Sequence, residues 1–105
     1  MASINTVMPR ISRNKDRCRT GHLCSTSAPV NASQRTVFAN NKPILVRGDR
    51  VAQHFIKFGI KCVAHRAKLT GSSRTVFVNG IGVGRKGDRA DFGAMTGASF
   101  NVNAG

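Results

Sequence analysis

The 105-residue sequence contains no tryptophan, no tyrosine and no glutamate, and its four acidic residues are all aspartates. Single-stranded nucleic acids are usually bound on aromatic platforms interleaved with basic residues, and most of these platforms are absent here. A catalytic Cys-His pair needs a third group to orient it, and three of the four aspartates belong to turn motifs. The composition therefore weakens both a nucleic-acid binder that stacks bases and a hydrolytic enzyme.

Long apolar segments are also missing. No run approaches the roughly 18 apolar residues that a membrane helix requires, and the first 15 residues, MASINTVMPRISRNK, lack the apolar core of a signal peptide. We therefore expect a soluble protein that is assembled in a cytoplasm. The three cysteines cannot all pair within one chain, and this odd count favours a reducing compartment and metal binding over a disulfide scaffold.

Basic residues are abundant. The chain carries 17 Lys and Arg against four acidic residues, so its formal net charge is +13. Such a charge predicts an anionic partner, most commonly nucleic acid, whereas the alternative is a solvated basic surface with no specific partner. Because few aromatic residues accompany the basic ones, the nucleic-acid hypothesis depends on charge alone. A chain of 105 residues forms at most one domain, and its small core would benefit from a metal or another cross-link.

One sixteen-residue phrase occurs twice, as RTVFANNKPILVRGDR at residues 35–50 and as RTVFVNGIGVGRKGDR at residues 74–89. Each copy has two apolar runs. Asn40-Asn41 separates them in the first copy, and Asn79-Gly80 separates them in the second. Asn-Gly between such runs predicts a β-hairpin with a type I′ turn, which needs positive φ at both central residues. The Gly-Asp-Arg that ends each copy predicts a turn in which the Asp side chain bonds to the backbone just beyond it.

Fragments of the same phrase stand near the two ends of the chain. Residues 15–17 (KDR) resemble the close of a unit, and residues 97–102 (GASFNV) resemble an opening. A linear stack of three hairpins would leave sheet edges exposed at both ends. If the two fragments at the chain ends together form the third unit, the three units close into a ring. We therefore predict a small all-β fold of three pseudo-threefold β-hairpin units. Three connections without a helical apolar period join them, at residues 18–34, 51–72 and 90–96.

Residues with metal-ligand chemistry gather in the first two connections, which hold Cys18, His22, Cys24, His54, Cys62 and His65. Loops that converge from a rigid scaffold suit a closed structural zinc site with four N or S ligands, which would add folding free energy to a small domain. Cys62-x-x-His65 has a spacing common in such sites. The alternatives are cysteines buried as small hydrophobic residues with histidines at the surface, or a catalytic Cys-His pair.

The recurring Val-Phe-x-Asn-Gly…Arg-x-Gly-Asp phrase, with His and Cys loops between its copies, resembles the PAAR-repeat proteins, the spike-tip subunits of contractile phage tails and type VI secretion machines. The resemblance covers residues 8–105 as a single domain and leaves residues 1–7 as an N-terminal extension. The stretch TGHLC at residues 20–24 is similar to the metal loop of the phage members. The resemblance implies a short cone stabilised by one zinc ion per chain, with the ligands His22, His54, Cys62 and His65.

The resemblance further implies a non-enzymatic structural tip that caps and sharpens the trimeric β-helical central spike of a contractile tail, one tip per trimer. Each pseudo-threefold unit would then address one partner subunit. The tip would touch the target outer membrane transiently during puncture, without binding a specific nucleic acid. It would belong to the virion, at the spike tip of the tail baseplate, after assembly in the host cytoplasm, or alternatively be secreted by a type VI system. A small basic nucleic-acid-binding protein is the other class of function.

Two departures from the family pattern bear on the fold. Lys15 stands where the pattern has Gly before Asp16, and Asn41 stands where it has Gly after Asn40. We therefore expect distortion in the first unit.

Overall fold

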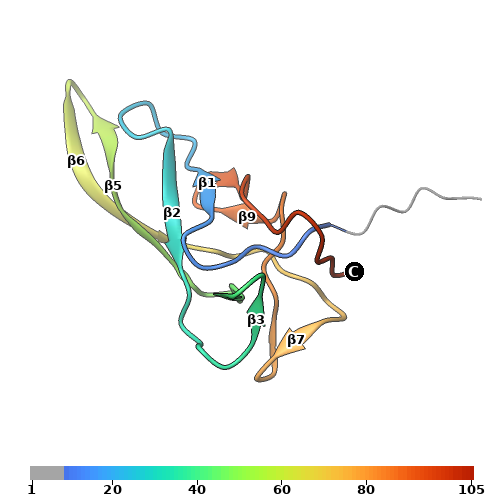
Figure 1. Cartoon of the computed structure of the whole chain (residues 1–105). Helices are drawn as coiled ribbons and strands as arrows, with labels where there is room; N and C mark the ends of the chain where they lie inside the picture. The colour runs from blue at the N-terminus through green and yellow to red at the C-terminus, as the bar shows by residue number, and fades with distance from the viewer. Residues whose placement is uncertain (1–8) are drawn as a thin grey trace, which may run out of the picture.

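The computed structural model describes residues 9–105, so the extension predicted at residues 1–7 lies outside the described residues. Within residues 9–105 the chain forms ten short strands and no helix (Figure 1). That part of the chain accordingly has no helix able to cross a membrane. The prediction of a small all-β fold is confirmed.

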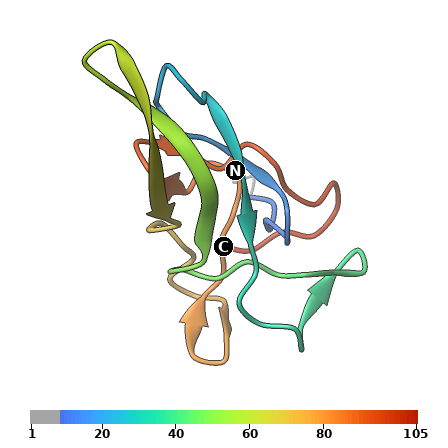
Figure 2. The ribbon, with the colours of Figure 1, turned by 90° about the vertical axis from the view of Figure 1, so that its left-hand side faces the viewer.

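The largest sheet is antiparallel, with the strand order β1-β2-β5-β6. Its strands are β1 (Arg17–Arg19), β2 (Ser27–Asn31), β5 (Arg50–Phe58) and β6 (Lys61–Lys68). We predicted a connecting loop at residues 51–72, and this is wrong, because the two longest strands lie there. They pair as a hairpin around Gly59-Ile60, where Gly59 has φ 66°, and this hairpin projects at one end of the molecule (Figures 1 and 2).

Each copy of the repeated phrase contains the predicted hairpin. The strands are β3 (Phe38–Ala39) with β4 (Lys42–Pro43), and β7 (Phe77–Val78) with β8 (Ile81–Gly82). All four turn residues have positive φ, at 52° and 65° for Asn40 and Asn41, and 52° and 79° for Asn79 and Gly80. The type I′ prediction is therefore confirmed. Asn41 replaces Gly without changing the turn, because Asn tolerates the left-handed conformation.

The Asp turn occurs three times, but the bonded backbone group lies before the Asp, and the prediction that it lies just beyond the Asp is wrong. In each, the Asp carboxylate accepts a hydrogen bond from the backbone N–H three residues earlier, at 2.7 to 2.9 Å; the pairs are Arg13 with Asp16, Val46 with Asp49, and Arg85 with Asp88. The residue before each Asp has positive φ, and Lys15 at 71° adopts this conformation as Gly48 and Gly87 do. The expected distortion of the first unit is thus absent from its Asp turn.

Backbone hydrogen bonds join the three segments into a closed cycle. Ser12 N donates to Gly84 O (2.9 Å), Gly84 N to Leu45 O (2.8 Å), and Leu45 N back to Ser12 O (3.0 Å). The two ends of the described residues also meet, since Ile11 N donates to Val102 O at 2.8 Å. The segments therefore form a ring. The pseudo-threefold symmetry of three hairpin units stays a prediction. Two of the units contain a hairpin, but the third is formed by segments from the two ends of the described residues.

The core consists of two small apolar clusters. One packs against the largest sheet and contains Cys18, Ala28, Val30, Leu45, Val51, Leu69, Ala90 and Met95. The other packs inside the ring and contains Ile11, Ala39, Ile44, Val46, Val78, Val83 and Ala104. Adjacent residues Leu45 and Val46 belong to different clusters and so connect them. Cys18 is a small buried hydrophobic residue, as one of the alternatives predicted. Its burial raises the pKa of its thiol.

A further short hairpin carries the remaining aspartate. It consists of β9 (Arg89–Ala90) and β10 (Gly93–Ala94), and the turn between them contains Asp91 with φ 56°. Gly93 permits β1 to approach closely, since a Cβ there would lie 1.7 Å from the carbonyl oxygen of Arg19. This approach brings the Asp91 turn beside the largest sheet.

Candidate metal centre

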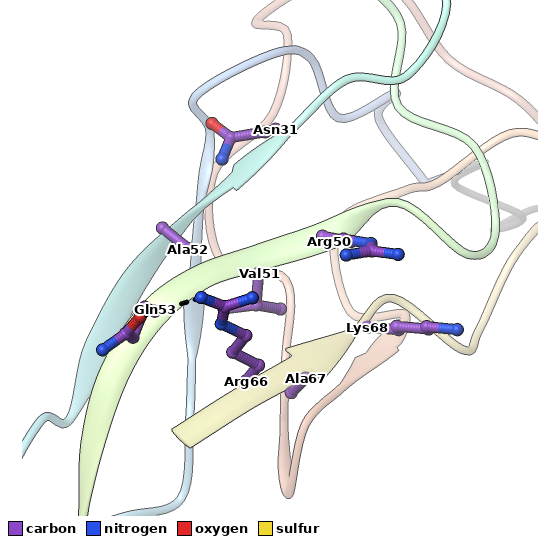
Figure 3. A pocket seen from close by; sticks show the side chains of 8 residues that line it. All are labelled: Asn31, Arg50, Val51, Ala52, Gln53, Arg66, Ala67 and Lys68. Carbon is purple, nitrogen blue, oxygen red and sulfur yellow. Dashed lines mark hydrogen bonds between the residues drawn. The ribbon is translucent and has the colours of Figure 1, made fainter. Parts of the chain in front are cut away.

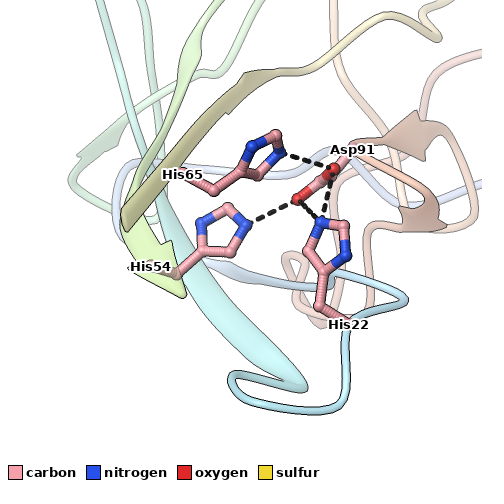
Figure 4. A group of neighbouring side chains, drawn as sticks. All are labelled: His22, His54, His65 and Asp91. Carbon is pink, nitrogen blue, oxygen red and sulfur yellow. Dashed lines mark hydrogen bonds and ion pairs between the residues drawn. The ribbon is translucent and has the colours of Figure 1, made fainter. Parts of the chain in front are cut away.

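Three histidines and one aspartate converge at one point of the fold (Figure 4). Their ligand atoms all lie within 4.8 Å of one another, and the residues are His22, His54, His65 and Asp91. His54 on β5 and His65 on β6 are cross-strand partners, so their rings share one face of the hairpin. His22 comes from the loop between β1 and β2, and Asp91 from the β9–β10 turn. Four separate segments therefore meet at this cluster.

The Asp91 carboxylate lies at the centre of the cluster (Figure 4). Its Oδ2 is 2.6 Å from Nε2 of His54 and 2.9 Å from Nε2 of His22, and its Oδ1 is 3.3 Å from Nε2 of His65. Burial alone would raise the pKa of the Asp91 carboxyl, but hydrogen bonds with His54, His22 and His65 together hold that pKa below its usual value. The carboxylate is therefore ionised at neutral pH.

The hydrogen bonds of His54 indicate that this cluster requires a positive charge. Its Nδ1 lies 2.8 Å from the carbonyl oxygen of Ala52, while its Nε2 faces Asp91. Both partners accept hydrogen bonds, but a neutral imidazole has only one N–H to donate. A second proton or a cation beside Nε2 resolves the conflict, and the Ala52 contact is the kind of outer contact that orients a metal-bound histidine. Three imidazoles and one carboxylate thus fit a four-coordinate metal ion.

Cys62, the fourth ligand implied by the family resemblance, lies outside the cluster. Its Sγ is bonded to Sγ of Cys24 in a disulfide. Cys62 and His65 are both on β6, three residues apart, and side chains at odd spacing point to opposite faces of a strand. In a loop, Cys-x-x-His can direct both side chains at one metal ion, but residues 61–68 form a strand. Asp91 occupies the place that Cys62 was predicted to take.

The disulfide also overturns the prediction that the cysteines favour a reduced, metal-binding role. It joins the loop of His22 to the strand of His65, across 38 positions of sequence. Closing a loop of this size stabilises a fold by about 4 kcal/mol in the chain-entropy model. The cross-link that a small core needs is therefore present in addition to the metal cluster.

Asp91 stands in the third connection, which contains no Cys or His and was not predicted to supply a ligand. A signal was available, since Asp91 is the one aspartate outside the three Asp turns. It follows Asp88 at a short distance, as His54 follows Asp49 in the preceding unit. Carboxylate oxygens also bind zinc, so an aspartate in the third connection is a possible ligand on chemical grounds alone.

Close backbone approach holds the His22 loop in place. Gly21 has φ 81°, and a Cβ there would lie 2.9 Å from the Cβ of Phe92. The ring of Phe92 packs edge-on against that of His22, with centroids 5.3 Å apart. Glycine at position 21 therefore lets the loop lie against the β9–β10 turn, so that His22 and Asp91 meet.

Comparison with known proteins agrees with this geometry. A family model described as the PAAR motif matches residues 20–97, a span that contains the whole His/Asp cluster and both repeat hairpins. A search of curated proteins gives no significant match. The PAAR-motif family is associated with spike-tip function in contractile injection systems, and its members are structural and metal-binding. Because the match covers well over half of the sequence, this chain belongs to the PAAR-motif family.

Proposed function

We propose that the chain is a non-enzymatic spike tip that caps the trimeric β-helical central spike of a contractile machine, with one tip per trimer. The observation that carries this proposal is the closed cycle of backbone bonds through Ser12, Leu45 and Gly84, by which one chain joins three similar segments. A single chain built in this way suits a partner with true threefold symmetry. The tip would be assembled in the host cytoplasm and carried on a virion, or alternatively be secreted by a type VI system.

The repeat hairpins supply a docking face for the spike. They lie at the opposite end of the molecule from the projecting β5–β6 hairpin (Figures 1 and 2). Phe38 and Phe77 occupy equivalent positions in the two copies, and their side chains are 53% and 55% exposed. The exposure of the same aromatic residue at equivalent positions of two copies supports this docking face.

A bound zinc ion would link four separate segments through His22, His54, His65 and Asp91. Metal ligation of this kind stabilises the folded state directly, because no preformed site exists in the unfolded chain. Together with the disulfide, it would keep a tip of 105 residues folded under the force of contraction. The proposed role depends on this rigidity.

Binding to the spike tests the proposal. Mixed with the trimeric spike of its own machine, the protein is expected to form a complex of one tip and three spike chains in native mass spectrometry. The double variant Phe38→Ser/Phe77→Ser should bind at least about tenfold more weakly, because two exposed aromatic contacts are lost. Leu23→Ser is the control, since Leu23 is 79% exposed but lies in the loop between β1 and β2. Absence of the complex, together with saturable DNA binding that weakens steeply with salt, would favour the nucleic-acid alternative.

The projecting end supports transient contact with the target outer membrane. At the β5–β6 turn, Phe58 is 73% exposed and Ile60 is 97% exposed. Lys61 is the cross-strand partner of Phe58, and Lys57 precedes Phe58 on β5. Apolar side chains beside lysines suit an anionic bilayer surface, because the apolar groups enter the interface while the ammonium groups stay at the headgroups.

Vesicle binding tests this contact. The double variant Phe58→Ser/Ile60→Ser is expected to bind anionic vesicles at least about tenfold more weakly than the parent in a sedimentation assay, because two apolar side chains no longer enter the bilayer. Phe77→Ser/Ile81→Ser is the matched control, since it removes the same residue types from the β7–β8 hairpin. Equal binding of the parent to neutral and anionic vesicles at low salt would contradict the role of charge, and an equal loss in both variants would contradict the role of the β5–β6 turn.

A further inference from the structure

A second site lies on the other face of the long hairpin. A hollow of about 420 Å³ opens over β2, β5 and β6, and its polar lining residues are Asn31, Arg50, Gln53, Arg66 and Lys68 (Figure 3). Arg66 and Lys68 are at odd spacing from His65 on β6, so they lie on the face opposite to the metal cluster. The hollow is therefore separate from the site described above.

The strand register places like charges side by side in this hollow. Arg50 is the direct cross-strand partner of Lys68, and Asn31 on β2 is the direct partner of Arg50 on its other side. Arg66 is two residues from Lys68 and shares its face. Like charges directly opposite each other destabilise a sheet, so an empty hollow costs the fold some electrostatic repulsion.

Nothing among residues 9–105 neutralises these charges. No carboxylate lines the hollow, and the chain's four aspartates are bonded elsewhere, three in the Asp turns and Asp91 in the metal cluster. Arg66 donates only to the neutral Oε1 of Gln53, at 3.3 Å. Within the same residues, the side chains of Arg50 and Lys68 have no hydrogen-bond or ion-pair partner. Two strong cationic donors are thus available at the hollow.

The surrounding side chains add further donors and positive charge. Lys15 Nζ donates to Oδ1 of Asn31 at 2.9 Å, which brings a fourth cation to the edge of the hollow. This bond uses the acceptor of Asn31 and leaves its two amide N–H groups available. Ala52, which also lines the hollow, is too small to fill it. The site therefore offers donors and space, and its polar chemistry suits an anion with several oxygens.

We propose that this hollow binds a phosphate group, of the phosphomonoester class, carried by a lipid headgroup or free in solution. The planar guanidinium groups of Arg50 and Arg66 can each donate two parallel hydrogen bonds to phosphate oxygens, and Lys68 contributes a point charge. A doubly charged anion would also cancel the repulsion across the strands. The proposal does not rest on spike-tip function, because it uses only the strand register and the charges of the hollow.

Thermal unfolding of the full chain tests the proposal, with inorganic phosphate as the first probe and phosphatidic acid vesicles as the second. The parent is expected to show a saturable rise in Tm of at least about 4 °C with one or both probes. In the variant Arg66→Gln/Lys68→Gln, the apparent affinity should fall about tenfold or more. Arg35→Gln/Lys42→Gln is the matched control, which removes one Arg and one Lys that are exposed outside the hollow.

The two probes distinguish the sources of phosphate. A rise with inorganic phosphate supports a site for free phosphate, and a rise with phosphatidic acid vesicles alone supports a lipid headgroup. In both cases, the Tm of the control variant Arg35→Gln/Lys42→Gln must rise as much as that of the parent. The proposal is overturned if neither probe changes the Tm, if the control loses as much affinity as the hollow variant, or if duplex DNA raises the Tm while both phosphate probes fail. In phosphate-free buffer, Arg66→Gln/Lys68→Gln should have a Tm at least as high as that of the parent, which shows that this variant is folded.

Discussion

Replacing Asp91 by alanine is expected to abolish zinc binding and to lower the stability of the zinc-loaded protein by at least about 3 kcal/mol. Asp91 supplies the charged oxygen toward which the Nε2 atoms of His22, His54 and His65 point. Without it, three imidazoles remain in a mostly buried site with no negative charge to balance a divalent cation. His54→Ala should have the same effect, because His54 is 4% exposed and its ring is held from both sides.

The measurement is elemental analysis of the purified variants, combined with thermal unfolding before and after addition of a chelator. One zinc per chain is expected in the parent and none in Asp91→Ala. Gln53→Ala is the control, since Gln53 adjoins His54 in β5 but lies outside the cluster. The double variant Cys24→Ser/Cys62→Ser decides between the two ligand sets. If it loses zinc while Asp91→Ala keeps it, the Cys62 set implied by the family resemblance is correct and the Asp91 set is wrong.

Removal of the disulfide is expected to destabilise the metal-free protein by about 4 kcal/mol, because it releases a constraint across 38 positions of sequence. In the zinc-loaded protein, Cys24→Ser/Cys62→Ser should still bind one zinc, but more weakly. The disulfide ties the loop that carries His22 to the strand that carries His65, so its loss leaves the His22 loop less ordered before the metal arrives.

Urea unfolding in the presence of chelator measures this effect without a contribution from metal. The single variant Cys18→Ala is the control, because the Cys18 thiol is buried in the core and is not bonded to another sulfur. Cys18→Ala should lower the free energy of unfolding by about 1 kcal/mol, as expected for the loss of one small buried group. If Cys24→Ser/Cys62→Ser unfolds at the same urea concentration as the parent, the disulfide contributes nothing to stability under these conditions.

The two cross-links compensate for a small core. The apolar clusters are made largely of Ala, Val, Ile and Leu, and no aromatic side chain belongs to either cluster within residues 9–105. A chain of this size buries a modest fraction of its surface, so added constraints make up a large part of its net stability. A metal ion in the His/Asp cluster would join four segments near the projecting hairpin, and the backbone cycle through Ser12, Leu45 and Gly84 joins three segments of the ring.

The sequence by itself determined the features that depend on neighbours in the chain. The type I′ turn at Asn79-Gly80 follows from the φ preferences of those two residues. A bond between Asp49 and the backbone of its own turn follows from the reach of one short side chain, although the bonded N–H is that of Val46 and not one beyond Asp49. Repetition of these local signals was enough to predict an all-β fold whose ends meet. The three histidines were candidate ligands because of their residue type and their clustering in the first two connections.

Only the tertiary structure decided which side chains share a face and which segments converge. Cys62 and His65 separate because their connection is a strand, where odd spacing changes the face. Asp91 joins the histidines because Gly93 and Gly21 let distant segments touch. The basic hollow exists because the β5–β6 register sets Arg50 opposite Lys68. These outcomes depend on pairing between residues far apart in sequence, which no local pattern specifies.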